Sequence, residues 1–324
     1  MSAVETVQPT LEAEYGTVGI RYWEANKELK VKRHYEVRDR SIHGPHADWH
    51  EVVSVTAAQD ILKKEALIHW GQRIGAGGIV KLCNLKVLQP VQVGGGQPVL
   101  GFYDAARGGM VVCDEWEAVE LLAKNGMAHW QVRDEAADRG TSVHDAFENF
   151  MLTGEIPDPT VYPITEQPFV IALVSFLRES GCEPRASEVM VAHVDDHWAG
   201  RYDGDIWLPE EKSLYSWRTD KGQGDAQTFF QKGLYRIDVK TGKGPFPEYG
   251  EQLEAYEAGA LYCGQEPSLQ RCVIQCKSDG RYAFVPVGSG HPRIPQYAWA
   301  SYEDFLFTLY KYRSIQARKE RRDG

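Results

Sequence analysis

Acidic residues and a lysine recur at every second position in two segments that alternate polar and apolar residues as strands do. Asp203 and Asp205 belong to the first segment, and Asp238 and Lys240 belong to the second. Residues two apart in a strand share a face, so these side chains converge if the two strands are neighbours. A solvated polar face, on the side of the sheet not needed for the core, is the ordinary explanation of such alternation. Asp is a poor strand former, however, and its repetition favours a cation site with a lysine beside it.

The chemistry that such a cluster could perform is hydrolysis of a phosphodiester. Mg²⁺ takes one or two carboxylates from a protein and completes its shell with waters and substrate phosphate. The ion polarises the phosphoryl oxygen and lowers the pKa of a bound water. An adjacent ammonium orients that water or stabilises the negative charge of the transition state. The pattern therefore predicts a nuclease-like site.

Four motifs, in order along the chain, resemble the PD-(D/E)XK nuclease superfamily. They are RGTSVHDAFENF with His144, GRYD with Asp203, IDVKTG with Asp238 and Lys240, and QLEAY with Gln252 and Tyr256. Within the superfamily they are most similar to the RecB-like exonucleases of bacteriophages and of CRISPR-associated systems. Residues 54–70 also resemble the N-terminal helix of the phage members, so that the resemblance spans roughly residues 52–287. It implies a central mixed sheet flanked by helices, the core of restriction-endonuclease-like proteins.

The resemblance also implies roles for individual residues. It makes His144, Asp203 and Asp238 ligands of Mg²⁺ or Mn²⁺, with the Val239 carbonyl as a candidate further ligand. Lys240 becomes the catalytic lysine, acting beside Asp203 and Asp238. Without the resemblance, His144 would be assigned to the core, because it lies on an apolar helix face.

Four further residues are candidates for supporting roles. Glu188 stands where the family often has an auxiliary acid, and a surface charge at the end of a strand explains it equally well. Asp205 is a candidate for supporting the ligands. Gln252 and Tyr256 are four apart on a helix and therefore share a face, and the resemblance suggests that they orient Lys240 or contact DNA.

The elements that must position these residues alternate between helical and strand-like periodicity. Helices are expected over 57–69, 114–125, 128–152, 169–180 and 249–263 and from 301, and strands over 188–194, 197–208, 233–240, 270–276 and 281–287. The glycine runs at 75–78 and 94–96 lack the GK[ST] of a phosphate loop and are expected to be turns. The order predicts a mixed α/β fold. We expect a helical N-terminal region (1–130) packing on or capping a nuclease core (131–300), a polar insertion at 209–232, and a C-terminal helix with a basic tail (301–324).

The charge balance limits how the chain could hold DNA. The chain has 36 Lys and Arg against 46 Asp and Glu, a net charge of -10, which excludes nucleic-acid binding by bulk positive charge. Locally, residues 311–322 carry six basic residues and one acid. Arg318, Arg321 and Arg322 are close together on a helix and could follow a phosphate backbone, while a frayed, solvated terminus is the alternative.

The N-terminal residues, the apolar stretches and the cysteines predict the cellular compartment and whether the chain holds an iron-sulfur cluster. The first residues do not resemble a secretory signal and no apolar stretch is long enough for a membrane span, so we expect a cytoplasmic protein, in the host cytoplasm if phage-encoded, with no membrane partner. Some CRISPR-associated relatives hold an iron-sulfur cluster on four cysteines. Cys83, Cys263, Cys272 and Cys276 lack the usual CxxC spacing. We therefore expect no cluster.

These observations lead to one expectation and two alternatives. The expected function is a metal-dependent DNA exonuclease acting in phage recombination, replication or repair, with DNA as partner and a helicase or recombination protein as a further one. A non-catalytic DNA-binding subunit with the same fold is the first alternative. An endonuclease on that fold is the second.

Overall fold

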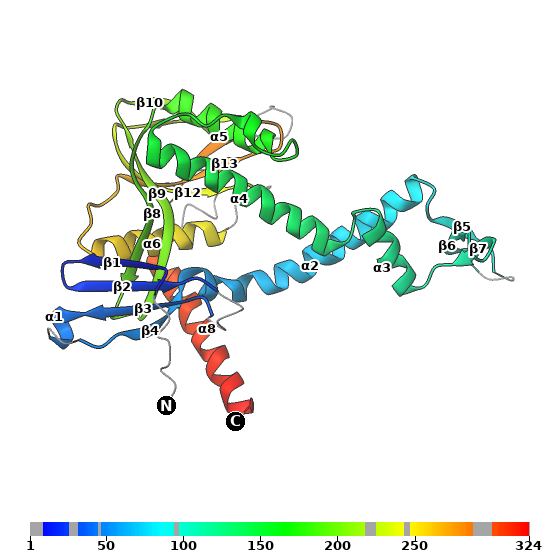
Figure 1. Ribbon diagram of the computed structural model, residues 1–324, viewed down its shortest axis with the longest axis horizontal. Helices are drawn as coiled ribbons and strands as arrows, with labels where there is room; N and C mark the ends of the chain where they lie inside the picture. The colour runs from blue at the N-terminus through cyan, green and yellow to red at the C-terminus, as the bar shows by residue number, and fades with distance from the viewer. Residues whose placement is uncertain are drawn as a thin grey trace, which may run out of the picture. The chain divides into compact units, whose positions relative to one another are not determined.

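The computed structural model describes residues 9–25, 32–44, 47–93, 97–217, 225–242, 247–287 and 300–323. The chain divides into two compact units, of which the larger comprises 1–62 with 139–324 and the smaller comprises 63–138. Helices α2 (Val55–Asn84) and α4 (His129–Thr153) contribute residues to both units. Each unit is an assembly of strands and helices in its own right (Figure 1).

The larger unit is built on a mixed sheet of nine strands in the order β1-β2-β3-β4-β9-β12-β13-β14, with β8 also paired to β9. The strands are β1 (Leu11–Tyr15), β2 (Val18–Trp23), β3 (His34–Asp39), β4 (His50–Ser54), β8 (Glu183–His193), β9 (Trp198–Leu208), β12 (Gly233–Lys240), β13 (Gln270–Cys276) and β14 (Tyr282–Pro286). The pairs β4–β9 and β12–β13 are parallel, and the other pairs are antiparallel.

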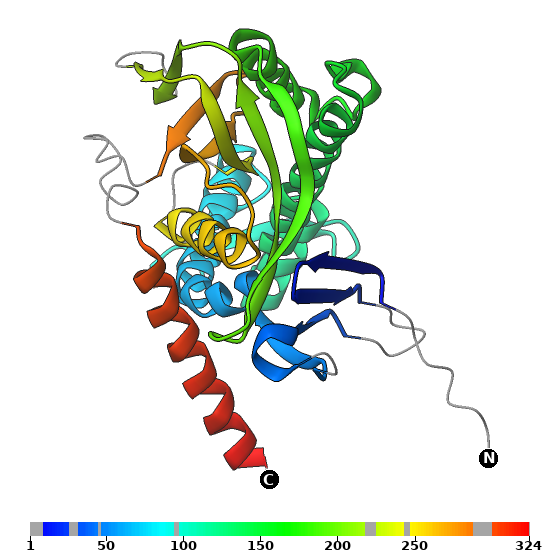
Figure 2. The same ribbon diagram turned by 90° about the vertical axis from the view of Figure 1, so that its left-hand side faces the viewer.

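Helices flank this sheet on both sides. The helices are α5 (Gln167–Ser180), α6 (Pro247–Tyr262) and α8 (Tyr302–Asp323), with the later part of α4 and the first turns of α2, besides the short α1 (Arg40–His43) and a 3-10 turn at Pro159–Val161. On one side, Phe147 and Phe176 pack over Ile206 and Ile237 of the strands. On the other side, α6 and α8 pack in a separate cluster, and Figure 2 shows α5 and α6 on opposite sides of the long β8–β9 pair. The fold is therefore mixed α/β, as expected.

The polar side of β9 and β12 is not the solvated face that the alternation predicts. Arg236 is fully buried at 0% exposure, and its guanidinium donates to both oxygens of Asp205, at 3.0 and 3.1 Å, and to Glu257 of α6 at 2.7 Å. Tyr202 stacks beneath it, with the guanidinium carbon 4.7 Å from the ring centroid. The expectation that this side is not needed for the core was wrong, because α6 covers it and each buried charge has a partner.

The N-terminal region contains helices, as expected, but also strands that the sequence patterns did not predict. Strands β1 to β4 extend the sheet of the larger unit from β9 outward. In the polar insertion, β10 (Lys212–Trp217) and β11 (Ala226–Phe230) form an antiparallel pair, and residues 218–224 between them lie outside the described residues.

The smaller unit combines parts of α2 and α4 with α3 (Glu115–Lys124) and a three-stranded antiparallel sheet. Its strands are β5 (Gln89–Val91), β6 (Val99–Asp104) and β7 (Gly109–Val112). α3 begins with a capping box, in which Asp114 and Glu117 each bind the other's backbone N–H. Within the described residues, the chain has no helix with the length and apolarity needed to cross a membrane.

The sequence analysis predicted a turn at the glycine run 75–78, and this prediction was wrong. The run lies inside α2. A Cβ on Gly78 would come within 2.4 Å of the Leu122 side chain, so this glycine serves close packing of two helices. The second run, 94–96, lies outside the described residues.

Candidate metal and catalytic site

Residues from three elements meet where β9 and β12 separate. The ladder between these strands ends with Ile237 opposite Gly204. One residue further along β9 and two residues further along β12, the backbone N–H of Val239 donates to Oδ2 of Asp203 at 2.6 Å instead of to a strand carbonyl. The Asp203 side chain therefore ends the pairing, and the gap between the strands exposes it to the helix above.

That helix is α4, and it contributes His144. The Nδ1 atom of His144 is 3.3 Å from Oδ1 of Asp203, and Nε2 is 3.0 Å from the carbonyl oxygen of Val239. The imidazole thus faces an acceptor on each nitrogen, which favours the doubly protonated ring. The Asp203 carboxylate, against the opposing effect of burial, raises the pKa of His144 to about 9.

The second carboxylate and the lysine lie at the end of β12. Lys240 Nζ donates to Oδ1 of Asp238 at 2.7 Å, and the two side chains are 19% and 3% exposed. Burial would lower the pKa of Lys240, but the carboxylates of Asp238 and Asp203 outweigh it and raise the pKa, so the ammonium keeps its proton. The ring of Tyr249, on the first turn of α6, has its centroid 5.2 Å from Nζ.

The residues present fit a hard divalent cation by their chemistry. Two carboxylates and a backbone carbonyl are the oxygen ligands that Mg²⁺ and Mn²⁺ prefer, and an imidazole completes the set. The Oδ2 atom of Asp238 is buried without a well-aligned hydrogen bond, although Lys240 Nζ lies 2.6 Å away. Among the described residues, no three His, Cys, Asp or Glu side chains stand together in a metal-binding arrangement. In this structure the negative charges of Asp203 and Asp238 are balanced by protonated His144 and by the ammonium of Lys240.

Glu188 lies beside this site. In the β8–β9 register it falls between Ser187, opposite Gly204, and Val189, opposite Tyr202, which places it across from Asp203. Its backbone is left-handed at φ 50°, a strained conformation for a residue with a side chain. Its carboxylate binds Nε of Arg201 at 2.7 Å. Burial raises the pKa of Glu188, against the opposing effect of Arg201. The acid is near the proposed ligands and is already paired.

The other supporting candidates make their hydrogen bonds to residues outside the proposed ligand set. Asp205 is bound by Arg236, as described above, and also accepts from Tyr202 at 2.8 Å. Gln252 donates to the hydroxyl of Tyr256 at 2.9 Å, and the two residues are 7% and 2% exposed. Their burial leaves no surface for DNA contact in this structure.

The aromatic residue next to Lys240 is instead Tyr249, which the sequence analysis missed. Its position in the first turn of the helix that follows the lysine strand was the available signal. Burial raises the pKa of Tyr249 to about 12, so the ring is a neutral neighbour for the ammonium.

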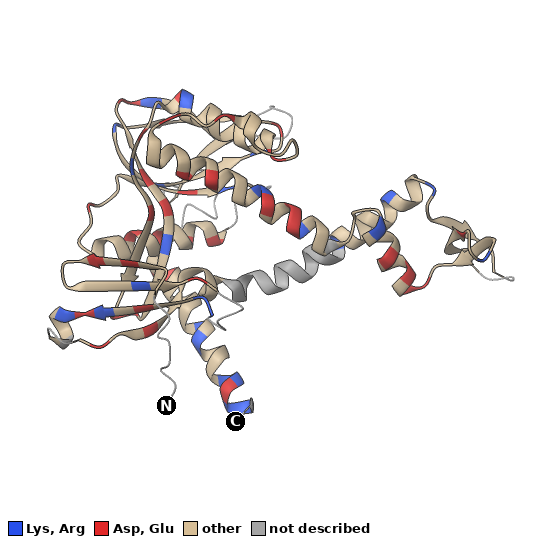
Figure 3. Cartoon of the chain, in the orientation of Figure 1, with Lys and Arg blue, Asp and Glu red and all other residues tan. Residues whose placement is uncertain are grey.

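The arginines proposed for DNA binding lie on α8, outside this cluster. Arg318, Arg321 and Arg322 are all exposed. Figure 3 shows Lys and Arg gathered on the last turns of α8. Glu320 lies among them in the sequence.

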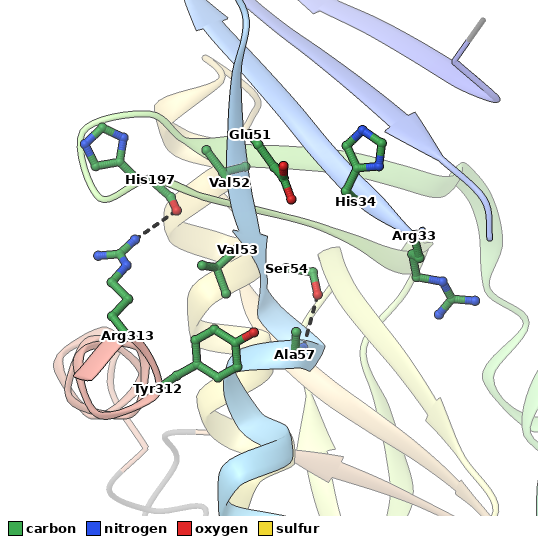
Figure 4. A pocket seen from close by; sticks show the side chains of 10 residues that line it. All are labelled: Arg33, His34, Glu51, Val52, Val53, Ser54, Ala57, His197, Tyr312 and Arg313. Atoms are coloured by element: carbon green, nitrogen blue, oxygen red, sulfur yellow. Dashed lines mark hydrogen bonds between the residues drawn. The ribbon is translucent and has the colours of Figure 1, made fainter. Parts of the chain in front are cut away.

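A pocket of about 360 Å³ lies elsewhere on the larger unit, between β4, the start of α2, the β8–β9 turn and α8 (Figure 4). Among its lining residues Glu51 is the only acid. Two-carboxylate metal chemistry is therefore not located there.

All six cysteines are free thiols. Cys272 and Cys276 are fully buried in the cluster under α5, whereas Cys263 belongs to a different hydrophobic cluster. Burial raises the pKa of Cys263 to about 11, so its thiol stays protonated.

Comparison of the chain with known proteins gives no further assignment. No family model matches it, and no curated protein matches it significantly.

Proposed function

We propose that this chain is a Mg²⁺- or Mn²⁺-dependent DNA exonuclease built on a PD-(D/E)XK core of the RecB-like type. The observation that carries the proposal is the meeting of His144, Asp203, Asp238 and Lys240, from three elements, at the point where β9 and β12 separate. Two carboxylates brought together from different strands in a buried place, with a lysine and a histidine beside them, are typical of functional sites, where charged groups are held close despite the cost of burial. A phage role in recombination, replication or repair belongs to the same proposal.

The residues divide the work according to their geometry. Asp203, Asp238, His144 and the Val239 carbonyl would hold the cation, which when bound supplies Lewis acidity toward the phosphodiester. The Val239 N–H fixes the orientation of Asp203. To serve as a ligand, His144 would have to be in its neutral form, with a ring nitrogen free for the cation.

Lys240 acts as a fixed positive charge. Its raised pKa keeps it protonated, so it stabilises negative charge that develops on the phosphate oxygens and does not accept a proton. The Asp238 carboxylate and the Tyr249 ring on either side limit its movement.

The test is digestion of end-labelled linear DNA and of circular DNA with Mg²⁺, Mn²⁺ or EDTA. We expect metal-dependent release of nucleotides from linear DNA, no cutting of circles, and loss of activity in Asp238→Asn. Asp134→Asn, which changes an exposed acid of the smaller unit, is the matched control and should stay active. Cutting of circles would indicate an endonuclease. DNA binding without hydrolysis under every metal condition would contradict the proposal and favour a non-catalytic subunit.

A further inference from the structure

Helix α8 is attached to the larger unit by one face only. Phe305 and Leu309 are fully buried in the cluster that includes α6. Tyr302 accepts from Nε1 of Trp198 at 2.8 Å. Arg313 donates to the carbonyl oxygen of His197 at 2.9 Å, beside the pocket drawn in Figure 4. The inward face alone therefore accounts for the docking of this helix.

The outward face carries two exposed aromatic rings. Phe307 is 74% exposed and Tyr310 is 57% exposed. Residues three apart on a helix are neighbours on its surface, so the two exposed rings lie next to each other. The Tyr310 ring has its centroid 5.9 Å from the guanidinium carbon of Arg313, and more than half of its side chain remains exposed.

Basic side chains follow the two aromatic rings along the same outward face of α8. Lys311, Arg318 and Arg321 follow Phe307 at spacings of 4, 11 and 14 residues, which keeps them on one side of a helix. All three are exposed. At about 1.5 Å of rise per residue the stripe is about 21 Å long. Residues 311–322 hold six basic residues and one acid in a chain of net charge -10, so positive charge is concentrated here.

We propose that this outward face of α8 binds single-stranded DNA. Bases stack on Phe307 and Tyr310, and Lys311, Arg318 and Arg321 neutralise phosphates along the helix. Aromatic platforms beside cations suit single strands, since an unpaired base offers a π-face that a duplex keeps inside its own stack. The inference rests on the proposed function, which makes DNA the substrate, and it names single-stranded DNA as the form that the chain holds.

The experiment measures binding separately from hydrolysis. Fluorescence anisotropy in EDTA compares a labelled oligothymidylate with a duplex of equal length, using the full chain. We expect Phe307→Ala with Tyr310→Ala to weaken single-strand binding by about fivefold or more and to leave duplex binding unchanged. Phe229→Ala is the matched control, because Phe229 is an aromatic residue 59% exposed on β11. Phe307→Tyr, which keeps the ring, should bind as the wild type does.

The contribution of the arginines is tested with the same binding assay, and the fold of each variant is checked by circular dichroism. Arg318→Gln with Arg321→Gln should flatten the slope of log K against log salt by about 1.4, at about 0.7 per phosphate contact. Circular dichroism of each variant should match that of the wild type.

Three results would overturn the proposal. They are unchanged single-strand binding in the Phe307→Ala, Tyr310→Ala variant, an equal loss for the duplex, and a change in oligomeric mass by light scattering without loss of single-strand binding. The last result would assign this face to contact with a second copy of the chain. The binding assay contains EDTA and does not depend on hydrolysis. If the Phe307→Ala, Tyr310→Ala variant loses single-strand binding while the wild-type protein hydrolyses no DNA with Mg²⁺ or Mn²⁺, only the nuclease proposal is overturned.

Discussion

Replacement of Lys240 by alanine tests the proposed mechanism most directly. The ammonium lies 2.7 Å from Oδ1 of Asp238, and with side chains 19% and 3% exposed the pair is largely shielded from water. A preorganised charge in such a site contributes about 2.7 to 4 kcal/mol to the barrier of the chemical step. Lys240→Ala should therefore lower the single-turnover rate by about 100- to 1000-fold.

The assay is single-turnover cleavage of end-labelled DNA at saturating Mg²⁺, with DNA and metal binding measured in parallel. Both kinds of binding should stay nearly intact in Lys240→Ala, whereas Asp203→Asn should also weaken metal binding. Lys232→Ala changes an exposed lysine near the start of the same strand and should cleave at the wild-type rate. A Lys240→Ala rate within about tenfold of wild type would refute the assigned role, since it would fall below the cost of any single preorganised charge.

Four other outcomes follow from the structure. Arg236→Ala should destabilise the protein by about 3 to 5 kcal/mol in urea unfolding, because it takes the cationic partner from the buried carboxylates of Asp205 and Glu257; a loss below about 1 kcal/mol would contradict this. In EDTA, the stabilising contribution of protonated His144, whose folded pKa of about 9 exceeds its ordinary 6.5, is fully present below about pH 6.5 and disappears as pH rises through about 9. The melting temperature should therefore fall over this range more in the wild type than in His144→Asn, and parallel curves would argue against the ion pair. Removal of residues 315–324, which include Arg318 and Arg321, should flatten the salt dependence of single-strand binding by at least about 1.4 units without changing the rate at saturating DNA, and an unaltered slope would place DNA elsewhere. Protein purified anaerobically should be colourless, and stoichiometric iron with acid-labile sulfide would contradict the expectation of no cluster.

Local sequence signals predicted several helices and strands, among them β9 and β12, on which the candidate site lies. The capping pair Asp114 and Glu117 marked the start of α3, and Gly181 marked the end of α5 in a left-handed conformation. Period-two alternation located β9 and β12. These signals succeed because caps and alternation are properties of a few neighbouring residues and need no knowledge of the rest of the chain.

The first two N-terminal strands, β1 and β2, were not predicted, although a turn signal lies between them in the sequence. Gly16 and Thr17 separate two paired strands as a tight turn would, with Tyr15 opposite Val18. The charged residues of β1 and β2 hide the alternation. Glu12 and Arg21, directly opposite each other, form an ion pair. Their partnership depends on pairing across strands, and a reading along one strand does not reveal it.

By itself the sequence determined the types of residue at the site and, through its motifs, the hypothesis that His144, Asp203, Asp238 and Lys240 act together. Only the tertiary structure decided which side of the strands is buried, because α6, the helix that follows β12, packs back onto that side and pairs Glu257 with Arg236. Regular alternation would put Asp203 and Asp205 on one strand face, yet Asp203 meets His144 of α4 whereas Asp205 is held by Arg236, which binds Glu257 of α6. Periodicity places a side chain on a face, but the elements packed against that face determine its partner.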